Sequence, residues 1–126
     1  MAIPEKYNRI RPFEPEELPE VCDRLLANPQ FQSVVKHVFP NVPLEAVETK
    51  MRGCKTLLDF QKAFCYPFLK DLLQKASKGI SFGHEAIDTH KRYTFVSNHR
   101  DIVLDSALLD VLLIEAGWET TCEIAI

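Results

Sequence analysis

The part of the sequence with the most evident chemical potential lies between residues 95 and 106, where one histidine stands close to two carboxylates. It reads Phe-Val-Ser-Asn-His-Arg-Asp-Ile-Val-Leu-Asp-Ser, and the three residues are His99, Asp101 and Asp105. A histidine can take a proton from a hydroxyl group near neutral pH, and a carboxylate beside it fixes its tautomer and stabilises the imidazolium that forms. The segment therefore predicts that His99 is a general base and that Asp105 orients it.

Spacing decides which carboxylate can serve His99. Asp105 follows His99 by six positions. On one regular helix, which turns about 100° per residue, this offset places the two side chains on different faces. The pair can close only if His99 lies in a loop ahead of the helix, and Asp101 is the alternative carboxylate if it does not. A buried or unpaired His99 would favour a non-catalytic role.

The elements around this segment predict an α/β arrangement. Runs typical of short strands occur at 80–82, at 93–96 and at 122–126, and an apolar helix is expected from Leu104 to Ala116, ended by Gly117. A strand, a helix and a strand at this spacing are typical of a βαβ unit with a parallel pair of strands. The loop between strand and helix would then lie where such sheets bind ligands, beside the free N–H groups of a helix start.

The first 78 residues are expected to be helical. A proline-containing arm covers residues 1–15, and apolar residues recur at helical spacing over 16–28, 31–39 and 44–53. The longest helix should begin at Thr56 in a capping box with Asp59, kink or restart at Pro67, and end before Gly79. The predicted fold class is therefore a helix-rich α/β chain. A helical extension fills residues 1–78, and an α/β domain begins at residue 79 and is cut at 126 after its first βαβ unit.

The segment around His99 resembles the first motif of a known enzyme family. Ser97-Asn98-His99-Arg100, followed by Asp105 and an apolar helix, resembles the motif of the glycerolipid acyltransferases, which acylate glycerol 3-phosphate or 1-acylglycerol 3-phosphate. The family places four residues between His and Asp, whereas five stand here. The segments at 79–83 and 93–96 also resemble the entry to that domain, so the resemblance covers residues 79–126.

The resemblance implies a mixed sheet and a reaction. An acyl group would move from acyl-CoA or acyl carrier protein to a glycerol hydroxyl in phospholipid synthesis, with no further cofactor and no metal. His99 would take the hydroxyl proton, Asp105 would hold His99, and Arg100 and Asn98 would bind substrate. The family's later glycine-rich and Phe-Pro-Glu-Gly blocks, which bind the acceptor phosphate, have no counterpart here. We therefore expect a longer natural enzyme, and no activity from residues 1–126 alone.

Composition limits the remaining classes of protein. The 126 residues are 46% apolar and carry a net charge of −3, which suits one small globular domain and argues against a disordered chain or a nucleic-acid-binding protein. No apolar run approaches the roughly 18–20 residues of a membrane span, and the charged start has no secretory signal. These observations predict a cytoplasmic protein. The scattered cysteines and histidines show no zinc spacing.

Two alternatives stay open. A stripe of aromatic and basic residues could pack in the core or lie on a membrane surface. An enzyme with lipid products must reach a membrane, and the stripe could make a peripheral contact with its inner face. Its members are Phe60, Lys62, Phe64, Tyr66, Phe68, Lys70, Lys75 and Lys78. The alternative function for the whole chain is a non-catalytic helical interaction or regulatory domain.

Overall fold

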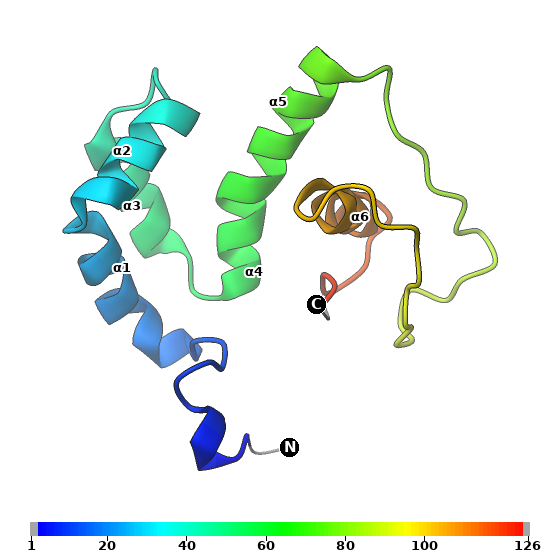
Figure 1. The fold of residues 1–126 in the computed structure, drawn as a ribbon, viewed down its shortest axis with the longest axis horizontal. Coiled ribbons are helices and arrows are strands. Elements are labelled where there is room, and N and C mark those ends of the chain that lie inside the picture. Colours follow the sequence, from blue (N-terminus) through cyan, green and yellow to red (C-terminus); the bar gives the residue numbers. More distant parts are fainter. Residues whose placement is uncertain (1–2, 125–126) are drawn as a thin grey trace. The chain divides into compact units, whose positions relative to one another are not determined.

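The computed structural model describes residues 3–124, and this part of the chain contains helices and connecting segments but no strand (Figure 1). The chain divides into two compact units. Unit 1 is Met1–Ala63 and unit 2 is Phe64–Ile126. The boundary falls within a π-helical turn, Gln61–Cys65, so each unit has its own set of packed helices.

Three helices of unit 1, α1 (Leu18–Leu26), α2 (Pro29–Val38) and α3 (Leu44–Gly53), pack on one another. They agree with the helices that the apolar spacing predicts. Asn28 separates the first two, because its side chain accepts the N–H groups of Gln30 and Phe31 at 2.8 and 3.2 Å and so caps α2. The core of this unit holds Val35, Val47 and Met51, and Met51 is 2% exposed.

The arm before α1 contains two 3-10 turns, Glu5–Tyr7 and Pro15–Glu17. Two guanidinium nitrogens of Arg11 donate to the two carboxylate oxygens of Glu17, each at 2.8 Å. This bond to Arg11 is the main reason that the pKa of Glu17 falls to about 2. A bidentate ion pair therefore holds the arm at the start of α1.

The expected restart at Pro67 is confirmed. The helix α4 (Leu57–Phe60) begins at Thr56 in the predicted capping box, with Thr56 and Asp59 exchanging bonds of 2.9 and 3.1 Å. The π-helical turn follows, and α5 (Tyr66–Ala76) then begins with Pro67 in its first turn. Proline has no N–H and its ring clashes with the preceding carbonyl in a helix interior. One wider, π-helical turn therefore precedes Pro67, and a new α-helix follows it.

Unit 2 consists of α5, a long connecting segment and α6 (Leu104–Glu115), which packs against α5 (Figure 1). The carboxylate of Glu115 accepts bonds from the Tyr66 hydroxyl at 3.0 Å and from Lys70 Nζ at 2.6 Å. Phe64 is buried, whereas Phe68 is 40% exposed. Part of the aromatic and basic stripe is therefore used for packing within unit 2.

The helix α6 ends as the sequence predicts. Gly117 adopts a left-handed backbone, with φ of 84°. The N–H of Trp118 donates to the carbonyl of Leu113 at 3.0 Å, and that of Gly117 to the carbonyl of Ile114 at 3.2 Å. These two bonds form a Schellman motif, which favours glycine at the left-handed position. Trp118 is thereby turned back against the unit and is 9% exposed.

The predicted α/β class is wrong, because the described residues form no strand and no sheet. The segments at 80–82, 93–96 and 122–124 are irregular chain, and residues 125–126 lie outside the described range. A strand needs a neighbouring strand to supply ladder hydrogen bonds. The aromatic and β-branched residues of these segments favour an extended backbone but do not provide that partner. No βαβ unit therefore surrounds His99.

None of the helices between residues 3 and 124 is both long and apolar enough to cross a bilayer.

Candidate functional site

His99 lies in the segment that precedes α6, as the pairing with Asp105 requires. Its Nδ1 atom is 3.2 Å from Oδ2 of Asp105. The His99 side chain is 64% exposed, while that of Asp105, in the first turn of α6, is 29% exposed. The structure therefore brings together the two residues expected to be base and orienting carboxylate, and it leaves the imidazole open to solvent.

The Asp105 carboxylate is held mainly by the backbone of the same segment. Its Oδ2 atom accepts the N–H of Arg100 at 2.6 Å and that of Asp101 at 2.9 Å. These two bonds, followed by the charge of His99 and its bond, lower the pKa of Asp105 below the ordinary range of an aspartate. The carboxylate is therefore ionised at neutral pH. A proton on Nδ1 of His99 can bond to it, and Nε2 is then free to accept one.

Asp101 has a different task from the one that spacing alone left open. Its Oδ1 atom accepts the N–H groups of Val103 and Leu104 at 2.9 and 2.8 Å. These bonds satisfy N–H groups that have no partner within the helix, and they lower the pKa of Asp101. The carboxylate of Asp101 is therefore turned toward the start of α6, and that of Asp105 faces His99.

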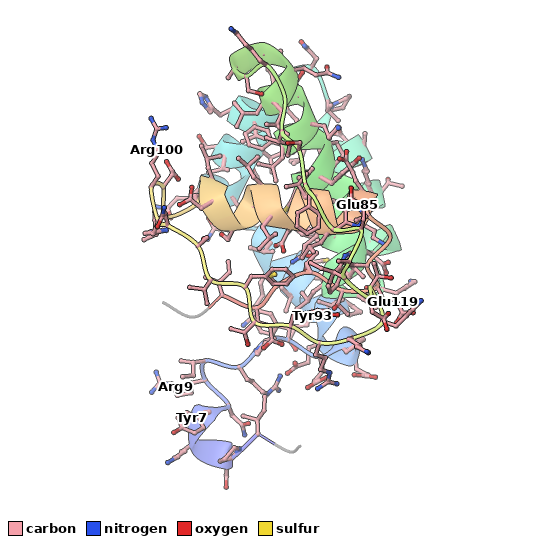
Figure 2. The ribbon with its side chains drawn as sticks, turned by 90° about the vertical axis from the view of Figure 1, so that its right-hand side faces the viewer. Tyr7, Arg9, Glu85, Tyr93, Arg100 and Glu119 are labelled. Carbon is pink, nitrogen blue, oxygen red and sulfur yellow. The ribbon has the colours of Figure 1, made fainter. Side chains whose placement is uncertain are left out.

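The two residues expected to bind substrate are exposed beside His99. Figure 2 shows the Arg100 side chain at the beginning of α6, directed away from the ribbon. Asn98 is also exposed. Three apolar side chains in the same segment are unusually open to solvent: Val96, Ile102 and Val103 are 92%, 68% and 65% exposed. The surroundings of the imidazole thus combine a cation, an amide and apolar surface.

A second histidine in unit 2 offers a comparison. Nδ1 of His90 is 3.7 Å from Oε1 of Glu119, and these side chains are 77% and 81% exposed. The pair is longer and more exposed than that of His99 and Asp105. His90 is therefore a matched control for His99.

Other features of the structure do not involve this segment. A hollow of about 250 Å³ in unit 1 is lined by Pro15, Leu18, Pro19, Cys22, Met51, Arg52, Cys54 and Lys55. Burial raises the pKa of the Cys54 thiol in it. Among the described residues, no three His, Cys, Asp or Glu side chains gather closely enough to hold a metal ion.

Comparison of the chain with protein-family models, with curated proteins and with solved structures gives no match. Any assignment of function therefore depends on the geometry around His99 and on the residues that surround it.

The lowered pKa values of Asp101 and Asp105 predict how this segment responds to acid. Each carboxylate stabilises the folded segment above the ordinary aspartate pKa of about 3.9, and this stabilisation is lost as the pH falls through the lower, folded value. In amide NMR spectra between about pH 5 and 2, the Arg100 and Leu104 signals should shift with midpoints below those of the corresponding unstructured peptide. Equal midpoints in the protein and the peptide would contradict the bonds.

Proposed function

We propose that this chain is the front part of a glycerolipid acyltransferase. The enzyme moves a fatty acyl group from an acyl thioester to the hydroxyl of glycerol 3-phosphate or 1-acylglycerol 3-phosphate in phospholipid synthesis. The observation that carries the proposal is the 3.2 Å contact between His99 and Asp105. It occurs within the Ser97–Arg100 segment that resembles the family's first motif, and it forms despite the additional residue between the pair.

The chemistry follows from the free nitrogen of His99. The acceptor hydroxyl bonds to Nε2, which takes its proton as the oxygen attacks the thioester carbonyl. The tetrahedral intermediate then collapses, the carbon–sulfur bond breaks, and the sulfur takes the proton back from the imidazolium. Asp105 stabilises the positive ring during this step. Such general base catalysis contributes typically about 10²- to 10⁴-fold in rate and needs no acyl-enzyme intermediate.

The neighbouring residues have roles in substrate binding under this proposal. The Arg100 guanidinium suits a phosphate group on the donor or the acceptor, because its planar fork can bind two oxygens. Asn98 can bond to a substrate oxygen or hydroxyl. The donor is acyl-CoA or acyl carrier protein. The protein acts in the cytoplasm and touches the inner face of the membrane peripherally, where its products belong.

The test is an assay of the natural protein that contains these residues. It would be given a long-chain acyl-CoA or an acyl carrier protein with glycerol 3-phosphate, with 1-acylglycerol 3-phosphate, or with no acceptor. Release of free thiol and formation of the ester, identified by mass spectrometry, would be measured together. We expect both to depend on an acceptor. If neither donor reacts with either acceptor, the proposal is wrong and the helical interaction domain becomes the better hypothesis.

A further inference from the structure

The contact between His99 and Asp105 needs an explanation, because a continuous helix would separate the two side chains. Six helical steps amount to about 600°, which leaves them about 120° apart around the axis. The observed distance between Nδ1 and Oδ2 is 3.2 Å. The chain must therefore leave the helical path between the two residues, and some group must hold it in that shape.

Asp101 bonds at both ends of this turn, through its carboxylate at one end and through its backbone N–H at the other. Its side chain accepts the N–H groups of Val103 and Leu104, which defines where α6 begins. Its own backbone N–H donates to Oδ2 of Asp105 at 2.9 Å. The same carboxylate oxygen accepts from Arg100 and contacts His99. The bonds of Asp101 therefore connect the start of α6 with Asp105, the carboxylate that contacts His99.

We propose that Asp101 is a positioning residue for the acyl-transfer base: it holds the capped turn that lets Asp105 reach His99 across five intervening residues. The inference rests on the proposed function for its catalytic meaning, but the arrangement itself can be measured without substrate. Asp101 acts here through its shape and its acceptor atoms. It does not contact the reacting groups.

The tautomer of His99 is the direct readout. A carboxylate at Nδ1 favours the form with the proton on that nitrogen. In the 126-residue chain, ¹⁵N NMR of the imidazole should show the neutral His99 ring mainly as the tautomer with its proton on Nδ1. In Asp101→Ala the capping acceptor is lost, and the tautomer population should shift toward that of His37, an exposed histidine of α2. Asp101→Asn keeps an acceptor at the same place and should retain the tautomer of the wild type.

Asp88→Ala is the matched control, because Oδ1 of Asp88 also accepts a backbone N–H, that of His90, at 3.0 Å. This substitution should leave the His99 tautomer unchanged. If Asp101→Ala fails to fold, Asp101→Gly replaces it, since glycine is nearly as well tolerated at a helix start but offers no side-chain acceptor. An unchanged His99 tautomer in the folded alanine or glycine variant would overturn the proposal. So would a loss in Asp101→Asn as large as that in Asp101→Ala, because charge rather than shape would then be responsible.

Activity supplies a second, separate readout. In the natural protein, Asp101→Ala should lower kcat for acyl transfer by about 10- to 10²-fold with little change in KM, because small displacements of a catalytic group cost this much. Asp101→Asn should restore most of it. If the wild type transfers no acyl group but the tautomer still responds to Asp101, the proposed function fails and the positioning role stands. If the enzyme is active and both readouts ignore Asp101, only the positioning role fails.

Discussion

Replacing His99 by alanine should lower kcat/KM for acyl transfer by about 10²- to 10⁴-fold in the natural protein, the range that a general base contributes. In the proposed mechanism Nε2 of His99 takes the hydroxyl proton, and we expect no neighbouring carboxylate to replace it. Both Asp101 and Asp105 have lowered pKa values and are poor bases as a result. The comparison of the two rates, with the fold of each protein checked by circular dichroism, measures the loss.

His90→Ala is the control for this experiment. His90 also lies beside a carboxylate, that of Glu119 at 3.7 Å, so its removal deletes the same ring and a similar contact. We expect the activity of this variant to stay within about twofold of the wild type, as for a surface substitution away from the site. Equal losses in the two variants would mean that His99 has no special role. Full activity in His99→Ala would contradict the proposed mechanism.

Asp105→Asn separates the ring from its support. The amide still accepts bonds from the Arg100 and Asp101 N–H groups, but it no longer carries the charge that favours the Nδ1 proton of His99. In a serine protease triad the same change lowers kcat by about 10⁴-fold because the wrong tautomer prevails. The exposed His99 ring, at 64%, is less constrained by packing. The loss here should therefore depend on how completely the tautomer changes, and ¹⁵N NMR of the same variant gives that fraction.

The helices could be predicted because their signals are local. Asn28 before Pro29, Thr56 before Asp59 and Gly117 after the last apolar turn each determine a helix end through bonds within a few residues. Pro67 predicts an interruption of the helix for the same reason, because the effect of its ring and its missing N–H is local. The π-helical turn before it was not predicted, since proline only requires that the helix be broken and leaves open how the chain widens.

The predicted strands are absent from residues 3–124, and this absence could not be predicted because strand formation is not local. Tyr93 and Phe95 alternate as in a strand, and both rings do face one way, with centroids 5.6 and 5.8 Å from that of Trp118. The alternation of side chains that is typical of a strand is therefore present. The ladder of backbone hydrogen bonds needs a neighbouring strand, and none is present in the described part of the chain. Local propensity alone gives the direction of side chains but not a sheet.

The contact between His99 and Asp105 could be predicted, whereas the backbone bonds that support it could not. Spacing requires that His99 lie ahead of the helix if it is to meet Asp105, and it does. The two backbone N–H groups that hold Asp105 were missed. Asp101 itself carries a local signal, because an aspartate side chain commonly accepts backbone N–H groups two or three residues on, as it does here from Val103 and Leu104. Asp101 was predicted as an alternative carboxylate for His99, and its bonds to the start of α6 were not predicted.

Trp118 is the residue of unit 2 whose replacement should cost the most stability. The ring is 9% exposed and meets Tyr93 and Phe95 edge to face. Trp118→Ala leaves a cavity, for which large aromatic truncations lose about 3–5 kcal/mol. Because a unit of fewer than about 70 residues rarely gains more than about 3–5 kcal/mol of net stability from its core, we expect most of the folding of unit 2 to be lost at ambient temperature. Urea titration followed through the α6 amide signals measures the loss, and Val96→Ala, at a side chain that is 92% exposed, should change it by less than about 0.5 kcal/mol.

Trp118→Phe distinguishes the ring from its nitrogen. Nε1 of Trp118 is buried and has no hydrogen-bond partner among residues 3–124, and an unsatisfied buried donor costs about 1–3 kcal/mol. Phenylalanine keeps an aromatic face for Tyr93 and Phe95 and removes that donor, so the gain offsets part of the lost contact area. This variant should therefore stay folded, with a net loss below about 1.5 kcal/mol, as for conservative core changes. A loss equal to that of Trp118→Ala would show that the indole, and not an aromatic ring in general, holds the segment that leads to His99.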